Sequence, residues 1–183
     1  NLRRKAPGID IEVIASNAVS DLIRREADIA IRNARPTQPD LIARKIRDDA
    51  AQLYATPGYL DQIGNPTCVE DLRHANFIGF DTNQVLVEGL NAHGLPVTKK
   101  NFPILTGSHL VMWSYVKQGL GIGVVPTSVG AADPDVRQVL PDLKPITFPI
   151  WLAAHREVKS SRRVRLVFDL LEHALSYPSA KTP

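Results

Sequence analysis

Hydrophobic and polar positions along the chain follow two periods, one of two residues and one of about 3.6, which are typical of strands and helices. Apolar and polar side chains alternate over residues 9–14, which predicts a strand with one buried face. Apolar residues recur at helical spacing from Val164 to Leu175, which predicts an amphipathic helix. The other expected strands cover residues 28–32, 41–47, 52–55, 77–80, 102–106, 122–125, 136–140 and 146–154.

Capping and turn residues predict where helices begin between these strands. Helices are expected to begin at Ser16 or Asn17, at Pro57, after a capping box in residues 67–70, near Val85 and at Ser108. This alternation predicts an α/β fold with mostly parallel strands. Two long extended stretches, residues 41–55 and 146–154, indicate that the chain crosses into a second lobe and returns.

The composition is that of an ordinary globular protein. The chain has 183 residues, of which 44% are hydrophobic and 22% are charged, so it can bury a core and is not expected to be disordered. Its single cysteine, Cys68, cannot form an internal disulfide, which suits a reducing cytoplasm. No apolar run reaches the roughly 18 residues that a membrane span needs. A net charge of +3 without a basic stripe argues against nucleic-acid binding by this chain.

Catalytic and cofactor motifs do not emerge from the sequence. The five histidines lack a second histidine or cysteine at metal-ligand spacing, so a metal site is not expected. Cys68 is interpreted as a small residue in the first turn of a helix rather than as a nucleophile. Gly119, Gly121 and Gly123 follow a predicted helix and precede a strand, the reverse of the order in a dinucleotide-binding loop. We therefore expect neither a cofactor nor an enzyme.

Polar side chains lie where predicted strands end and helices begin. In open α/β sheets, ligands bind beyond the carboxyl ends of strands, where helix N-termini favour anions. The candidate binding residues are Ser16, Asn17, Arg32, Thr106, Ser108 and His109. Taken singly, these residues are better explained by helix capping or, for Arg32, by a surface ion pair. Their occurrence in both predicted lobes favours a cleft for a small molecule.

A series of short motifs resembles LysR-type transcriptional regulators. The series includes Asp28-Ile-Ala-Ile-Arg32, Leu53-Tyr-Ala-Thr-Pro-Gly-Tyr-Leu60 and Gly119-Leu-Gly-Ile-Gly123. Further matching segments are residues 22–27, 35–36, 39–45, 69–74, 116–118, 126, 139–141, 151–152 and 162–165. No single motif is specific, but their order extends over nearly the whole chain.

The resemblance implies two Rossmann-like lobes joined by two crossover strands, similar to type 2 periplasmic solute-binding proteins. Lobe I would comprise residues 1–47 and 147–183, and lobe II residues 48–146. The resemblance places the six candidate residues at or near a cleft that takes a small effector, and the helix N-termini there favour an anionic one. It also implies a cytoplasmic regulator that forms homodimers or homotetramers and binds DNA only through an N-terminal winged helix-turn-helix.

The family's DNA-binding domain, linker helix and first strand have no counterpart in this sequence, nor does most of the first helix of lobe I. We therefore expect a fragment with an incomplete lobe I, which an intact mass compared with 20.1 kDa tests. Two alternatives stay open: a periplasmic-type solute receptor and, less favoured, a small enzyme. The sequence names neither the effector nor the operator.

Overall fold

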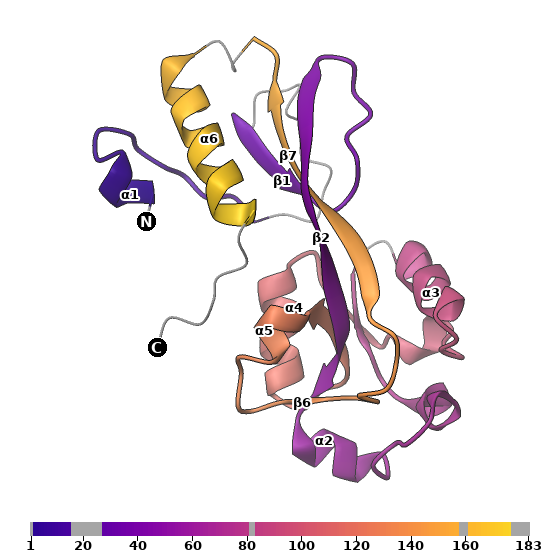
Figure 1. Cartoon of the computed structure of the whole chain (residues 1–183). Helices are drawn as coiled ribbons and strands as arrows, with labels where there is room; N and C mark the ends of the chain where they lie inside the picture. Colours follow the sequence, from indigo (N-terminus) through magenta and orange to yellow (C-terminus); the bar gives the residue numbers. More distant parts are fainter. Residues whose placement is uncertain (1, 16–26, 81–82, 158–160, 177–183) are drawn as a thin grey trace. The chain divides into compact units, whose positions relative to one another are not determined.

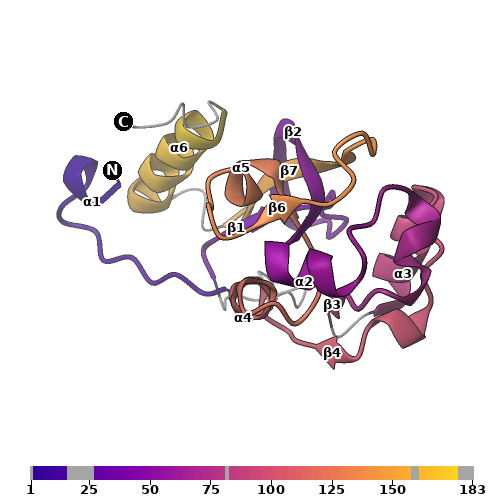
Figure 2. The same ribbon diagram turned by 90° about the horizontal axis from the view of Figure 1, so that it is seen from below.

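The computed structural model describes residues 2–15, 27–80, 83–157 and 161–176 (Figures 1 and 2). The chain divides into two compact units. The first unit combines the N-terminal part up to Asp49 with the C-terminal part from Phe148, and the second unit comprises Ala50–Thr147. Two long strands, β2 (Leu41–Ala55) and β7 (Ile146–His155), contribute residues to both units and confirm the two extended stretches expected from the sequence.

In the first unit, β7 lies between β1 (Ile29–Arg32) and β2 in the sheet (Figure 1). β1 runs antiparallel to β7, with Ile29 opposite Ala154 and Arg32 opposite Trp151. The expected C-terminal helix is α6 (Arg162–Ser176), and the chain also begins with a short helix, α1 (Leu2–Lys5). The first unit is thus a sheet with α6 packed on it.

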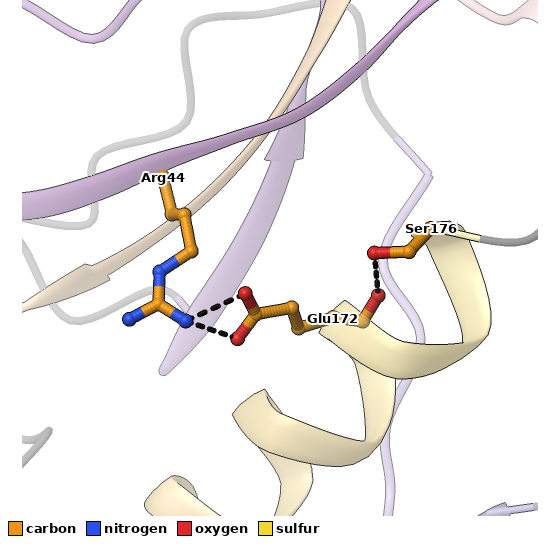
Figure 3. A network of polar contacts seen from close by, with 3 residues as sticks. All are labelled: Arg44, Glu172 and Ser176. Carbon is orange, nitrogen blue, oxygen red and sulfur yellow. Dashed lines mark hydrogen bonds and ion pairs between the residues drawn. The ribbon is translucent and has the colours of Figure 1, made fainter.

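The face of α6 that meets the sheet is apolar. Phe168 is buried against Leu152 and Ala154 of β7, and Leu171 and Leu175 pack around this cluster. Arg44 of β2 donates to both carboxylate oxygens of Glu172 and so ties the C-terminal part of α6 to β2 (Figure 3). Within α6, Ser176 closes the last turn by donating to the Glu172 carbonyl at 2.8 Å. The amphipathic stripe predicted from the sequence is therefore the packing face of α6.

The second unit contains the remaining strands and helices. β3 (Ile78–Gly79) pairs in parallel with β4 (Ile104–Leu105), and Phe77 forms a parallel bridge with Ile122 beside β5. β5 (Gly123–Pro126) and β6 (Arg137–Gln138) both run antiparallel to β2. The helices are α2 (Pro57–Gln62), η1 (Val69–His74), α3 (Asn83–Ala92), η2 (Lys99–Asn101), α4 (His109–Lys117) and α5 (Thr127–Gly130).

Hydrophobic side chains on opposite faces of β2 form two separate clusters in the second unit. Leu53 belongs to one cluster, with Phe77 and Ile122. Tyr54 belongs to the other, with Met112 of α4 and other apolar residues. Because successive side chains of a strand point to opposite faces, β2 forms a wall shared by both clusters.

The strand predicted over residues 9–14 does not form in the structure. Ile11, Val13 and Ile14 are 38%, 86% and 58% exposed. An alternating pattern produces a strand only when a neighbouring strand supplies hydrogen bonds, and no described strand pairs with this segment. The prediction of a strand here is therefore wrong.

Other differences concern strand direction and capping. Three described ladders, β1 with β7 and β2 with β5 and β6, are antiparallel, whereas β3 pairs in parallel with β4. Asp71, not Glu70, completes the capping box of η1 by accepting from the N–H groups of Thr67 at 2.8 Å and Cys68 at 3.1 Å. These N–H donors hold the pKa of the Asp71 carboxyl below its ordinary range.

Candidate functional site

Residues 106–109 connect the carboxyl end of β4 to α4 (Figure 2). The N–H of Thr106 donates to the carbonyl of Gly79 at 3.0 Å, which continues the parallel pairing of β3 with β4. The hydroxyl oxygen of Thr106 accepts from the N–H of Ser108 at 3.2 Å. Thr106 is therefore fixed at the end of the strand pair, where ligands bind in open α/β sheets.

Ser108 occupies the position directly before α4, as the sequence predicts, but its side chain does not cap the helix. Its backbone is extended, with φ −128° and ψ 122°, and its carbonyl accepts the first helical hydrogen bond, from Met112, at 2.9 Å. The first N–H groups of a helix have no partner within the helix. The Ser108 hydroxyl takes up none of these N–H groups, and it lies at a helix N-terminus, where polar and anionic ligands are favoured.

His109 begins α4 and stacks against Phe80, with ring centroids 4.1 Å apart and an interplanar angle of 38°. His109 as a whole is exposed, but partial burial of its imidazole lowers the pKa of His109 from its ordinary value of 6.5. A neutral imidazole offers one donor and one acceptor. Residues 106–109 therefore combine neutral hydrogen-bonding side chains with a helix N-terminus.

Arg32 lies in the first unit, at the last position of β1 and opposite Trp151 of β7. Side chains at directly opposed positions of an antiparallel pair share one face of the sheet. The Arg35 guanidinium lies over the Trp151 ring, 5.7 Å from its centroid. The indole N–H of Trp151 is buried without a hydrogen-bond partner. Arg32, Arg35 and Trp151 thus place two cationic groups and one unused buried donor at one end of this sheet.

The structure brings together three of the six predicted site residues: Thr106, Ser108 and His109. Arg32 belongs to the other unit, and its approach to these three stays a prediction. Ser16 and Asn17 lie outside the described residues.

Sequence reasoning missed Phe80 and Trp151. Phe80 follows directly after β3, so the pairing of residues 77–80 with the strand at 102–106 was the signal that could have placed it beside His109. Trp151 is identified only by the register between β1 and β7, which has no local sequence signal.

Two structural observations limit the kinds of site. Within the described residues, no group of three or more histidine, cysteine, aspartate or glutamate side chains could hold a metal ion. In the same part of the chain, no helix has both the length and the apolar character to cross a membrane.

Comparison with known proteins identifies the class to which this fold and site belong. The chain matches the family model described as the LysR substrate binding domain over residues 1–176, and it therefore belongs to that family. The family consists of domains of transcriptional regulators rather than enzymes, as expected from the absence of a catalytic motif.

Two relatives are regulators of the HTH type. The chain is 26% identical over 134 residues to the regulator PtxR of Pseudomonas aeruginosa, covering 71% of this chain and 42% of that protein. It is 25% identical over 177 residues to the probable regulator LtrA of Klebsiella pneumoniae, covering 92% of this chain and 57% of that protein. The chain thus spans about half the length of these two relatives.

Solved structures show the same fold. The regulatory domain of CrgA, a LysR-type regulator from Neisseria meningitidis, superposes with a TM-score of 0.81 at 23% identity, covering 94% of this chain and 87% of that chain. The effector domain of AmpR from Pseudomonas aeruginosa superposes with a TM-score of 0.72 at 18% identity, covering 96% of this chain and 84% of that chain. The fold is therefore that of LysR regulatory domains, the type 2 periplasmic-binding-protein-like fold predicted from the sequence.

Proposed function

We propose that this chain is the effector-sensing domain of a bacterial LysR-type transcriptional regulator and that it binds a small anionic metabolite. Membership of the LysR substrate-binding family over residues 1–176 carries this proposal. The donors at residues 106–109 and the cationic groups beside Trp151 support an anion as the ligand.

The first unit would recognise the charged group of the effector. A guanidinium forms a charge-assisted pair with a carboxylate, often through two parallel hydrogen bonds. Arg32 would supply this pair, and the unused indole N–H of Trp151 would gain a partner. A buried donor left unpaired costs about 1–3 kcal/mol, so an acceptor placed there adds to affinity.

The second unit would recognise polar groups through residues 106–109. The hydroxyls of Thr106 and Ser108 and the neutral imidazole of His109 both donate and accept hydrogen bonds. This chemistry suits hydroxyl or carbonyl groups of a metabolite as well as a carboxylate.

Regulation would follow from a ligand-dependent change of population. A ligand shifts an equilibrium between two arrangements only when it binds them with different affinities. In this proposal, residues 1–47 with 147–183 form lobe I and residues 48–146 form lobe II, and the effector favours one arrangement of the lobes. The whole regulator would act in the cytoplasm as a homodimer or homotetramer that binds DNA through a separate N-terminal domain.

A ligand screen followed by calorimetry tests the proposal. Because a ligand that binds only the native state raises its stability, a screen of carboxylate metabolites by thermal shift identifies the effector. Arg32→Ala should then weaken its binding by roughly tenfold to a hundredfold, the range for a charge-assisted hydrogen bond. Arg163→Ala, which removes an exposed arginine from α6, is the matched control and should bind normally. Equal affinity of the wild type and Arg32→Ala would refute the role of Arg32.

A further inference from the structure

A hollow of about 570 Å³ opens on the second unit, and none of its lining residues belongs to the candidate effector site. Its lining comes from the end of η1, the end of α3, the turn that leads into η2 and η2 itself. Sites for small molecules commonly occupy 300–1,000 Å³. The hollow therefore has the size of a metabolite site.

The hollow has a fixed polar frame. Asn101 is 5% exposed, and its amide group donates to the carbonyls of Arg73 at 2.8 Å and Ala75 at 2.9 Å. Its side-chain oxygen accepts from the N–H of Thr98 at 2.8 Å. One buried side chain thus ties the end of η1 to the turn before η2, which sets the spacing between the backbones of Arg73 and Lys100.

The ionisable side chains that line this hollow are all basic. Arg73, His74 and Lys100 line it and are exposed, and no acidic residue is part of its lining. Among the residues that the structure describes, neither Arg73 nor Lys100 takes part in an ion pair. Two unneutralised cations beside a hollow attract a multiply charged anion.

Within the described residues, the acidic residues of the neighbouring elements, Glu70 and Asp71 of η1 and Glu88 of α3, form no ion pair with the basic side chains of the lining. Asp71 of η1 accepts from the N–H groups of Thr67 and Cys68. Glu88 of α3 accepts from Gln84. The positive charge at the hollow is therefore left to an external anion.

We propose that this hollow is a second ligand site, which binds the phosphate group of a small organic phosphate. The Arg73 guanidinium would hold two phosphate oxygens, and the Lys100 ammonium would supply a second positive charge. Pro96 and Val97 form an apolar part of the lining, against which the carbon skeleton of the ligand would pack. This site goes beyond the proposed effector function, because it needs neither Arg32 nor residues 106–109.

A chemical-shift titration of backbone amides in the 183-residue chain tests this proposal. The probes are inorganic phosphate, phenyl phosphate and succinate, each at constant ionic strength set with sodium chloride. Phosphate should produce saturable shifts at residues 73–74 and 97–101. Phenyl phosphate should bind more tightly than phosphate, because its ring packs on the apolar lining. Tighter binding of succinate than of either phosphate would overturn the assignment of ligand class.

Variants distinguish a specific site from general attraction between charges. Arg73→Ala and Lys100→Ala should each weaken phosphate binding by about tenfold. Lys144→Ala removes an exposed lysine that is not part of the lining and should leave binding unchanged. Shifts that do not saturate, or equal weakening by all three substitutions, would overturn the proposal. Since none of these variants alters Arg32 or residues 106–109, a negative result leaves the effector proposal standing.

Discussion

Asn101 provides the sharpest test of how the second unit is held together. Within the described part of the chain it is the one buried polar side chain, and all of its hydrogen-bonding atoms have partners. Asn101→Ala removes two donated bonds, of 2.8 and 2.9 Å, and two accepted bonds, from the N–H of Thr98 at 2.8 Å and from its hydroxyl at 3.2 Å. It leaves the carbonyls of Arg73 and Ala75 and the N–H of Thr98 without this partner.

The expected loss follows from the number of bonds. A hydrogen bond contributes about 1 kcal/mol net, and a buried group left unpaired costs about 1–3 kcal/mol. We expect Asn101→Ala to lower the free energy of unfolding by about 3–4 kcal/mol. Asn101→Asp should be at least as destabilising at pH 7, because it keeps the acceptor for Thr98 but places a buried charge beside two carbonyl oxygens.

Urea-induced unfolding followed by far-ultraviolet circular dichroism measures these losses. Asn91→Ala is the matched control, because Asn91 is exposed and donates to the Val97 carbonyl at 3.1 Å. This control should lose about 1 kcal/mol. Equal losses for Asn101→Ala and Asn91→Ala would refute the reasoning that burial multiplies the cost of the missing bonds.

Three further substitutions test other parts of the structure. A methyl group at Gly130 would lie 2.3–2.5 Å from ring atoms of Tyr54, so Gly130→Ala should cost about 1–3 kcal/mol in urea unfolding. Phe168 is 1% exposed, and Phe168→Ala should cost about 3–5 kcal/mol in the same measurement. Burial lowers the pKa of His109, so its proton resonances should titrate below pH 6.5, and Phe80→Ala should return the midpoint toward 6.5. In the wild type, the unfolded chain binds the imidazole proton of His109 more readily than the folded chain does. The contribution of His109 to the free energy of unfolding is therefore present above pH 6.5 and is lost as the pH falls below it.

Each of these predictions has a result that contradicts it. Gly58→Ala is the control for Gly130, because a methyl group there meets no atom within 4 Å, and equal losses would exclude the clash. Leu166→Ala is the control for Phe168, since Leu166 is 45% exposed, and an equal loss would exclude the packing role of Phe168. A His109 midpoint that Phe80→Ala leaves unchanged would show that the ring contact does not bury the imidazole.

The parts of the fold that could be predicted from the sequence are those with a local cause. The helix from Ser108 and the helical stripe from Val164 to Leu175 follow from capping and side-chain spacing, and α4 and α6 confirm them. Residues 9–14 show the limit, because alternation specifies which face a side chain occupies but not whether a neighbouring strand exists.

The candidate site likewise has a part that local sequence predicts and a part that depends on tertiary pairing. Thr106, Ser108 and His109 are neighbours in sequence, so a strand-to-helix switch was enough to place them together. The stacking of Phe80 on His109 and the position of Trp151 depend on strand register, which is set by tertiary pairing. The basic hollow beside Asn101 had no sequence signal, because its lining comes from three separate elements.

The order of two adjacent residues in β2 protects the strand against misalignment. Leu53 and Tyr54 face different clusters, and the ring of Tyr54 occupies the space that the missing side chain of Gly130 leaves. If the strand slipped by one position, a phenol ring would enter a space shaped for leucine, while the gap beside Gly130 would stay unfilled. A one-residue slip of β2 would therefore disturb packing on both faces of the strand, which disfavours a wrong register with its partner strands.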